Sequence, residues 1–366
     1  SSAAMGWLRT ATPLPPAETY VAVEGLDREE HAAVVRAVRD PGGEVASGAA
    51  PDRVVLAGAT VALQRAAERL QAGRARAAGL AIAAALARYR SARAQRAPTL
   101  VMGILNVTPD SFSDGGRFAE PAAAIARAEA MAADGADVVD IGGESTRPGA
   151  EEVPAEEELR RVLPVVEALA DRAGLRLSID TRKAAVARAC LDAGAWMIND
   201  VSAGTHDPAM LGVVARAGAR IVLMHMRGTP ATMQQQPEYD DVVADTGRYL
   251  RERCAAAVEA GIPPENLWID PGFGFGKTVE HNLAIMHRLR EYTAIGPPLL
   301  IGPSRKSTLG RVLEVTLGPT PPTERLEATA AAVTAAILRG ARMVRVHDVR
   351  EMVRVARMAD ALRDVG

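Results

Sequence analysis

From Thr99 to the C-terminus the sequence repeats one pattern eight times: a short apolar run, a loop with Gly, Asp or Asn, and an amphipathic helical stretch. Short apolar strands that alternate with helices pair in parallel, through right-handed crossovers. Eight such units in roughly 265 residues predict an α/β fold that closes into a (β/α)8 barrel, and a doubly wound open sheet is the alternative. The apolar runs are TLVMGIL, ADVVDI, LRLSID, AWMIN, ARIVLMH, NLWID, PPLLIG and ARMVRV.

The first part of the chain follows a different pattern. Three prolines mark residues 1–17 as a tail, and residues 18–73 predict a small α+β domain. Its strands are expected in TYVAVEGL, GGEVAS and RVVLAGA, and its helices in DREEHAAVVRAVRD and TVALQRAAERLQ. Residues 74–97 predict a helical linker, and residues 98–366 the barrel domain, so the fold class is a (β/α)8 barrel with a small N-terminal α+β domain.

Composition argues against two classes of partner. The net charge is −2 and aromatic residues make up 3% of the chain, which argues against nucleic acid. The longest apolar run, residues 77–87, is shorter than the ~20 residues of a membrane helix. Cys190 and Cys254 lie in Ala-rich helical patterns, so we expect two inert thiols in the reducing cytoplasm and no cysteine metal site.

In a barrel of this kind the chemistry lies where strands end and the following loops begin. Polar residues recur at nearly every such point, and each could instead cap a helix. Capping explains Asp180, Asn199 and Asp270 less well as a set, because all three follow apolar runs directly. Two carboxylates and an amide suit a planar heterocycle with a guanidine-like edge, such as a pterin or guanine. Lys306 could reach a ring carbonyl, and Phe275 could pack beside the ring or in the core.

A second group of residues is suited to an oxyanion. Arg345 and His347 are two residues apart on one strand and so point to one face, although a solvated pair is the more common reading of Arg-x-His. Arg147 lies in a Gly- and Pro-rich loop. Asn106 offers an oxygen ligand for Mg²⁺ that bridges phosphates, and Ser304 stands at a predicted helix start that favours a carboxylate or phosphate.

Lysine is rare in this chain, which makes each lysine informative. Of 43 basic residues only Lys183, Lys277 and Lys306 are lysines. Lys277 lies in the segment GFGFGKT, which nearly matches a P-loop, but Pro271 occupies the position of the first glycine. We therefore do not predict a P-loop NTPase.

Taken together and in order, seven motifs resemble the dihydropteroate synthase family. The resemblance covers about residues 98–366 and leaves the first ~95 residues outside it. The motifs are Asn106–Gly116, Ile141–Gly149, Ser178–Lys183, Ile198–Asp200, Asp270–Lys277, Ser304–Lys306 and Arg345–His347.

The resemblance implies a TIM-barrel transferase that condenses 6-hydroxymethyl-7,8-dihydropterin pyrophosphate with 4-aminobenzoate, with Mg²⁺ and as a homodimer. It implies catalytic roles for Asn106, Arg147, Lys306, Arg345 and His347. It implies a pterin site of Asp180, Asn199, Asp270 and Lys306, to which we add Met224 at the end of the fifth run; a pyrophosphate site of Arg147, Arg345, His347 and Asn106 with Mg²⁺; and an aminobenzoate pocket of Thr146, Pro148, Phe275 and Ser304.

Two related functions compete with this hypothesis. A methyltetrahydrofolate methyltransferase resembles the same pterin site but has no use for the pair Arg345 and His347. A catalytically silent pterin-binding protein is expected to have damaged first and second loops, and both motifs are intact here. A purely structural barrel is the third alternative.

Overall fold

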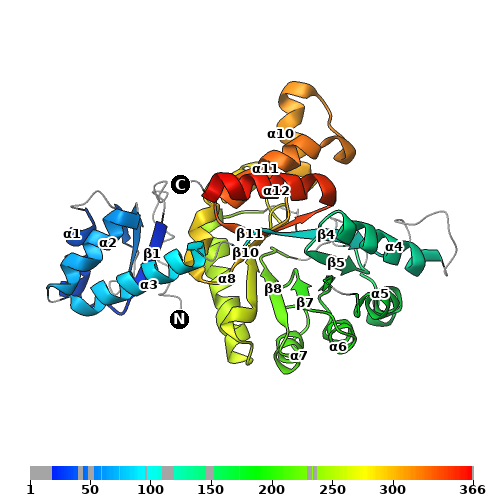
Figure 1. Ribbon diagram of the computed structural model, residues 1–366, viewed down its shortest axis with the longest axis horizontal. Coiled ribbons are helices and arrows are strands. Elements are labelled where there is room, and N and C mark those ends of the chain that lie inside the picture. The colour runs from blue at the N-terminus through cyan, green and yellow to red at the C-terminus, as the bar shows by residue number, and fades with distance from the viewer. Residues whose placement is uncertain are drawn as a thin grey trace. The chain divides into compact units, whose positions relative to one another are not determined.

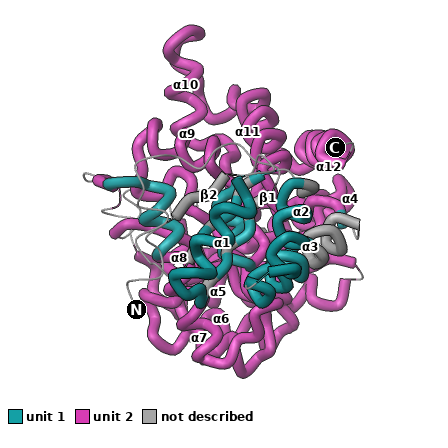
Figure 2. Tube along the Cα trace, turned by 90° about the vertical axis from the view of Figure 1, so that its left-hand side faces the viewer, with its two compact units in different colours: residues 1–97, 240–248, 290–296 teal, residues 98–239, 249–289, 297–366 magenta. Residues whose placement is uncertain are grey.

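The computed structural model describes residues 19–39, 44–47, 53–58, 60–73, 75–94, 97–108, 119–145, 152–172, 174–228, 233 and 237–364. The chain forms two compact units, which Figure 2 shows in different colours. The first unit comprises residues 1–97, 240–248 and 290–296, and the second comprises residues 98–239, 249–289 and 297–366.

The N-terminal part of the first unit has the strands and helices that the sequence predicts. Strands β1 (Thr19–Glu24), β2 (Glu44–Ser47) and β3 (Arg53–Gly58) form an antiparallel sheet in the order β1-β3-β2. Alternate apolar residues of β1 and β3 enter one core because successive strand residues face opposite sides. Helices α1 (Arg28–Arg39) and α2 (Thr60–Gln71) cover that core. Helix α3 (Arg76–Ala94), in the stretch expected to be a linker, adds Ile82 and Leu86 to it.

The second unit confirms the predicted barrel: all eight apolar runs are strands. They close in the order β10-β11-β4-β5-β6-β7-β8-β9, which excludes the open sheet, and Figure 1 shows helices around them. The paired strands of the barrel are parallel. The strands are β4 (Leu100–Asn106), β5 (Val138–Gly142), β6 (Arg176–Asp180), β7 (Met197–Asp200), β8 (Arg220–Met224), β9 (Leu267–Asp270), β10 (Leu299–Ile301) and β11 (Ala341–Val346).

Each barrel strand is followed by one helix, or by two in the case of β10, because parallel strands need a long crossover connection. These helices are α4 (Ala119–Ala133), α5 (Ala155–Leu169), α6 (Ala184–Asp192), α7 (Met210–Ala217), α8 (Val242–Glu259), α9 (Val279–His287), α10 (Ser307–Leu317), α11 (Leu326–Leu338) and α12 (Val349–Asp364). Short 3-10 helices lie at Pro264–Asn266, Leu289–Ile295 and Pro322–Glu324. Within the described residues, no helix combines the length and apolar character that a membrane crossing requires.

The interior of the barrel is apolar in its lower part. Seven of the eight strands contribute one residue each to a buried cluster: Met102, Val138, Met197, Val222, Trp268, Leu300 and Met343. On β6 the residue opposite Asp140 is Ser178, which is fully buried. The polar residues at the carboxyl ends of the strands therefore lie above an apolar floor, which keeps water from entering from below.

Candidate active site

The guanidinium of Arg345 on β11 bonds to carboxylates of β5 and β6. Asp180 ends β6 and lies in register with Asn199 on β7. Arg345 of β11 donates from Nε to Asp140 Oδ2 at 2.6 Å and from Nη2 to Asp180 Oδ2 at 2.8 Å. Asn199 Nδ2 also donates to Asp140 Oδ2, at 2.9 Å. A carboxylate only accepts, so Asp140 fixes the amide of Asn199 with its nitrogen toward Asp140.

Two buried carboxylate oxygens next to this guanidinium are open acceptors. Asp180 Oδ1 and Asp140 Oδ1 have no hydrogen-bond partner among the described residues. Burial raises the pKa of Asp180 to about 7, against the opposing effect of Arg345. A ligand that donates N–H groups would relieve both the missing hydrogen bond and the cost of the buried charge.

A third carboxylate lies at the end of β9. Asp270 is in register with Met224 of β8, and both side chains are buried. Asp270 Oδ1 accepts from the backbone N–H of Gly272 at 2.7 Å, and burial raises the pKa of this carboxyl.

The loop after β9 needs its glycines. Gly272, Gly274 and Gly276 all have positive φ. A Cβ at Gly272 would lie 1.9 Å from the carbonyl oxygen of His225, and one at Gly274 would lie 2.7 Å from Lys306 Cδ. Residues with side chains would push the loop away from both neighbours. The glycines therefore let this loop wrap closely around Lys306.

Lys306 lies among aromatic rings and carbonyl oxygens. Its Nζ donates to the Phe273 carbonyl and lies 4.3 Å from the ring centroid of Phe275. Burial lowers its pKa to about 7, with Asp270 opposing this shift. Phe273 is fully buried, whereas Phe275 is partly exposed at the site, so the core role belongs to Phe273.

Lys277 stabilises the same loop through hydrogen bonds. Its Nζ donates to the Phe275 carbonyl at 2.9 Å and lies 3.1 Å from His225 Nδ1. Burial lowers the pKa of Lys277 to about 7. Burial, aided by Lys277, also lowers the pKa of His225 to about 2, so this imidazole is neutral and can accept from Lys277.

On the other side of Arg345, a serine and a histidine pair. Ser304 Oγ lies 3.0 Å from His347 Nδ1 and accepts from the His347 backbone N–H at 3.2 Å. Ser304 is buried and His347 is partly exposed. These contacts join the turn after β10 to the end of β11, next to Arg345.

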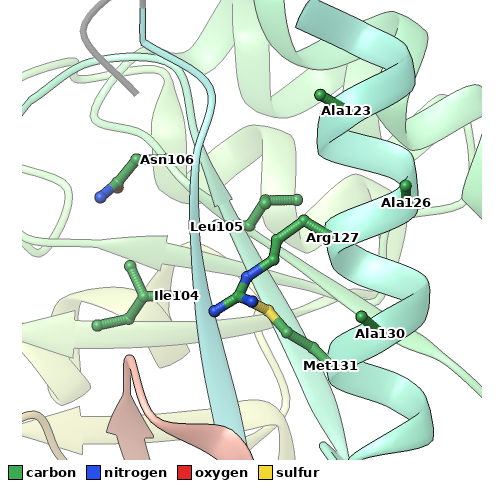
Figure 3. Close-up of a pocket in the computed structure, with 8 residues that line it drawn as sticks. All are labelled: Ile104, Leu105, Asn106, Ala123, Ala126, Arg127, Ala130 and Met131. Carbon is green, nitrogen blue, oxygen red and sulfur yellow. The ribbon is translucent and has the colours of Figure 1, made fainter. Parts of the chain in front are cut away.

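Asn106 lies at the end of β4, across Gly142 from Asp180. A Cβ at Gly142 would lie 3.5 Å from Asp180 Cβ and 3.8 Å from Asn106 Oδ1. Figure 3 shows Asn106 and Ile104 on one side of β4 and Leu105 on the side of α4. A cavity of about 590 Å³ opens between β4 and α4, and Asn106 is the one predicted site residue among the eight that line it. Through Asn106, this cavity therefore adjoins the polar residues around Asp180.

A buried ion-pair network anchors the start of the second loop. Glu144 pairs with Arg182 at 2.6 Å and with Lys183, and Lys183 also pairs with Glu158 at 2.6 Å. All four residues are buried. The positive charges come from the end of β6 and the start of α6, so the network holds two neighbouring loops together.

A model of the family described as pterin binding enzyme matches residues 102–347. The chain is 48% identical to the dihydropteroate synthase of Escherichia coli over 261 residues, which are 71% of this chain and 90% of that protein. The chain belongs to the dihydropteroate synthase family.

Solved structures agree with this family assignment. The dihydropteroate synthase of Xanthomonas albilineans with 4-aminobenzoic acid superposes with a TM-score of 0.67 at 47% identity, over 73% of this chain and 94% of that chain. A structure of the enzyme from the same organism in complex with 7,8-dihydropteroate has a TM-score of 0.65 at 44% identity, over 73% and 95% of the two chains.

The structure brings together most of the residues expected in a dihydropteroate synthase site. They are Asn106, Asp180, Asn199, Met224, Asp270, Phe275, Ser304, Lys306, Arg345 and His347. Thr146, Arg147 and Pro148 lie outside the described residues. The Asn199 amide nitrogen donates one of its two N–H groups to Asp140.

Sequence reasoning missed two residues that shape this site, Asp140 and Lys277. Asp140 joins Asn199 to Arg345, and in the sequence it lies inside the apolar run ADVVDI. Lys277 braces the glycine-rich loop, and the rarity of lysine was the signal that could have found it.

Proposed function

We infer that this chain is a dihydropteroate synthase: it condenses 6-hydroxymethyl-7,8-dihydropterin pyrophosphate with 4-aminobenzoate and releases 7,8-dihydropteroate and pyrophosphate. One observation carries this inference within the family. Open carboxylate acceptors and a lysine lie beside an arginine and a histidine at one mouth of the barrel. The first group suits the donor edge of a pterin, and the second suits a diphosphate.

Asp180 and Asp270 accept from the pyrimidine edge of the pterin in this proposal. Asp180 Oδ1 is an acceptor without a partner among the described residues, and a pterin N–H or NH2 group would complete it. Lys306 donates to the ring carbonyl instead of to Phe273. Asn199 contributes its amide oxygen and its second N–H, because the first N–H is donated to Asp140.

Arg345, His347 and Arg147 bind the pyrophosphate in this proposal. Arg345 also touches Asp180, so it lies between the heterocycle and the leaving group. 4-Aminobenzoate contacts Phe275 and Ser304 in this proposal, and Thr146 and Pro148 are expected to complete its pocket.

The reaction needs no activated nucleophile. The C–O bond to pyrophosphate breaks and its electron pair leaves with the pyrophosphate, while the electron-rich ring stabilises the cationic methylene. The neutral arylamine nitrogen then donates its lone pair to that carbon and loses one proton. We propose this dissociative route because positioning and charge stabilisation are what the site residues provide.

We propose that Mg²⁺ accompanies the pyrophosphate, with Asn106 as its protein ligand. Asn106 offers a hard amide oxygen at the mouth, next to Gly142. Among the described residues no group of three His, Cys, Asp or Glu could hold a metal. Both facts suit a cation carried mainly by phosphate oxygens, which it would neutralise. Calorimetric titration of pyrophosphate with and without Mg²⁺ tests this. Mg²⁺ should tighten binding more in the unaltered protein than in Asn106→Leu, and equal effects would remove Asn106 from the metal site.

We propose a homodimer that uses the exposed apolar side of α10. Val315 and Leu317 are 83% and 74% exposed, and Val312 is 42% exposed. Apolar side chains gathered on one helix are typical of a covered surface. Light scattering should give twice the chain mass, and Val315→Glu should shift the protein to monomer. A monomer in the unaltered protein would contradict the proposal.

We propose a reducing compartment, the cytoplasm, as the location. Both Cys190 and Cys254 are free and buried, and burial raises the pKa of each thiol to about 12. Fractionation of source cells with a specific antibody tests this proposal.

A pyrophosphate-release assay with and without 4-aminobenzoate tests the function itself. Release that depends on 4-aminobenzoate, with formation of dihydropteroate, is the expected result. Saturable pterin binding without release would identify a silent pterin-binding protein instead.

A further inference from the structure

Arg305 has a backbone conformation that side-chain-bearing residues rarely adopt. Its φ is +59°, and among the described non-glycine residues only Ala203 shares a positive φ. Such a conformation persists only when the surroundings hold it. Arg305 stands between Ser304 and Lys306, two residues of the proposed site.

The backbone of Arg305 is held from α11 and the segment before it. Its amide donates to Thr329 Oγ1 at 3.2 Å, and its carbonyl accepts from Arg325 Nη1 at 2.8 Å. Arg325 is itself fixed, because its Nε and Nη2 both donate to the Thr320 carbonyl, at 2.9 and 2.7 Å. These bonds shape the turn after β10.

The side chain of Arg305 crosses to the next strand. Its Nε donates to Asp348 Oδ2 at 3.0 Å, and its Nη2 donates to Asp348 Oδ1. The two parallel bonds fix both direction and distance, which a single bond would not do. Asp348 directly follows His347, and the Ser304 hydroxyl contacts His347.

We propose that Arg305 and Asp348 are a positioning pair that keeps the pterin end and the pyrophosphate end of the site in register. Neither residue was assigned a role in substrate binding. The pair ties the turn that carries Lys306 to the strand end that carries Arg345 and His347. This proposal rests on the proposed function, because it takes the two ends of the site from it.

Glycine at position 305 separates positioning from stability. Arg305→Gly removes the guanidinium but adopts a positive φ without strain, so it should not lower stability through the backbone. Asp348→Asn keeps the shape of the acceptor and removes its charge. Glu129→Gln breaks the exposed ion pair Arg172–Glu129 and serves as the matched control.

The readout is binding of two probes by calorimetry: 6-hydroxymethylpterin, and pyrophosphate with Mg²⁺. Lys306→Met should weaken only the pterin, and His347→Gln only pyrophosphate. Arg305→Gly and Asp348→Asn should each weaken both probes, on the order of tenfold, because small displacements of site groups are costly. The double variant should bind each probe no more weakly than the single variant with the lower affinity, since both substitutions break the same link between Arg305 and Asp348. Arg305→Lys should restore part of the loss.

The proposal fails if Arg305→Gly and Asp348→Asn bind both probes within twofold of the Glu129→Gln variant. It also fails if they lose binding only in proportion to a loss of thermal stability. If Arg305→Gly does not fold, Asp348→Asn, which leaves the turn backbone unchanged, decides the question. Pyrophosphate release by the unaltered protein is measured alongside, so failure of the proposed function is seen separately.

Discussion

At the scale of single residues, Asp270 is a direct test of the proposed pterin site. Asp270→Asn can keep the bond from the Gly272 amide to Oδ1, so the loop should stay in place. The new NH2 group would face ligand donors, however. We expect kcat/KM to correspond to a loss of about 2–4 kcal/mol of transition-state stabilisation. Steady-state kinetics measure this, with the exposed Asp171→Asn as control. Near-normal kcat/KM would place Asp270 outside the site.

The cost of burying Lys306 should appear in the pH dependence of stability. Burial lowers its pKa from 10.5 to about 7. Below pH 7 the lysine is charged in both the folded and the unfolded chain, so the full cost is present. As pH rises from 7 to 10.5 the folded chain alone has lost the proton, and the cost disappears. Lys306→Met should therefore raise the free energy of unfolding by about 1–3 kcal/mol at pH 6 and by little at pH 10.

Urea titrations at the two pH values measure this difference. Lys183→Met is the contrasting variant, because Lys183 is buried against Glu144 and Glu158. Loss of that partner should lower the free energy of unfolding by about 3–5 kcal/mol at pH 6. Destabilisation by Lys306→Met at pH 6 would show that burying the charged Lys306 does not lower the free energy of unfolding.

At the scale of elements, the loop between β9 and α9 depends on its close approach to β8. Gly272→Ala would place a Cβ 1.9 Å from the His225 carbonyl oxygen, and backbone atoms cannot rotate away. The loop must then move, and with it Asp270 and Phe275. We expect kcat/KM to fall on the order of 100-fold.

Gly218→Ala is the matched control for this loop. Gly218 has a φ of +61°, but no atom lies within 4 Å of its added Cβ. This variant has the backbone strain alone, so its kcat/KM should stay normal. Equal losses in both variants would mean that the loss reflects strain in general rather than contact with His225.

At the scale of the whole molecule, closure of the barrel joins residues far apart in sequence. Asp360 of α12 accepts from the Thr99 amide at 2.9 Å and from its hydroxyl at 2.6 Å, just before β4. Arg363 and Asp360 also pair, at 2.9 Å. Asp360→Ala should lower the free energy of unfolding by about 2–4 kcal/mol, because it leaves buried donors unpaired.

Both KM values should stay unchanged in Asp360→Ala, because Thr99 precedes β4 and the proposed site lies at the other end of the strands. Denaturant unfolding and kinetics on the same preparation measure the two effects. A large change in KM with little change in stability would contradict this division between the two ends of the barrel.

The sequence by itself determined the architecture and the positions of the polar residues. Eight apolar runs separated by helical stretches allow few arrangements besides a parallel barrel. Strands joined by helices pair in parallel, and eight such strands can close on themselves. Strand ends then place Asp180, Asn199, Asp270 and Arg345 at one mouth. Periodicity and position alone are enough for this, because both are local properties of the chain.

Only the tertiary structure decided which polar groups are left for a ligand. One N–H of Asn199 is used by Asp140, and Lys277 supports the loop instead of reaching the mouth. The link from Arg305 to Asp348 joins residues 43 positions apart. Each of these pairings depends on how neighbouring strands and loops meet once the barrel has closed. That geometry is a property of the packed barrel, and no single segment of the sequence contains it.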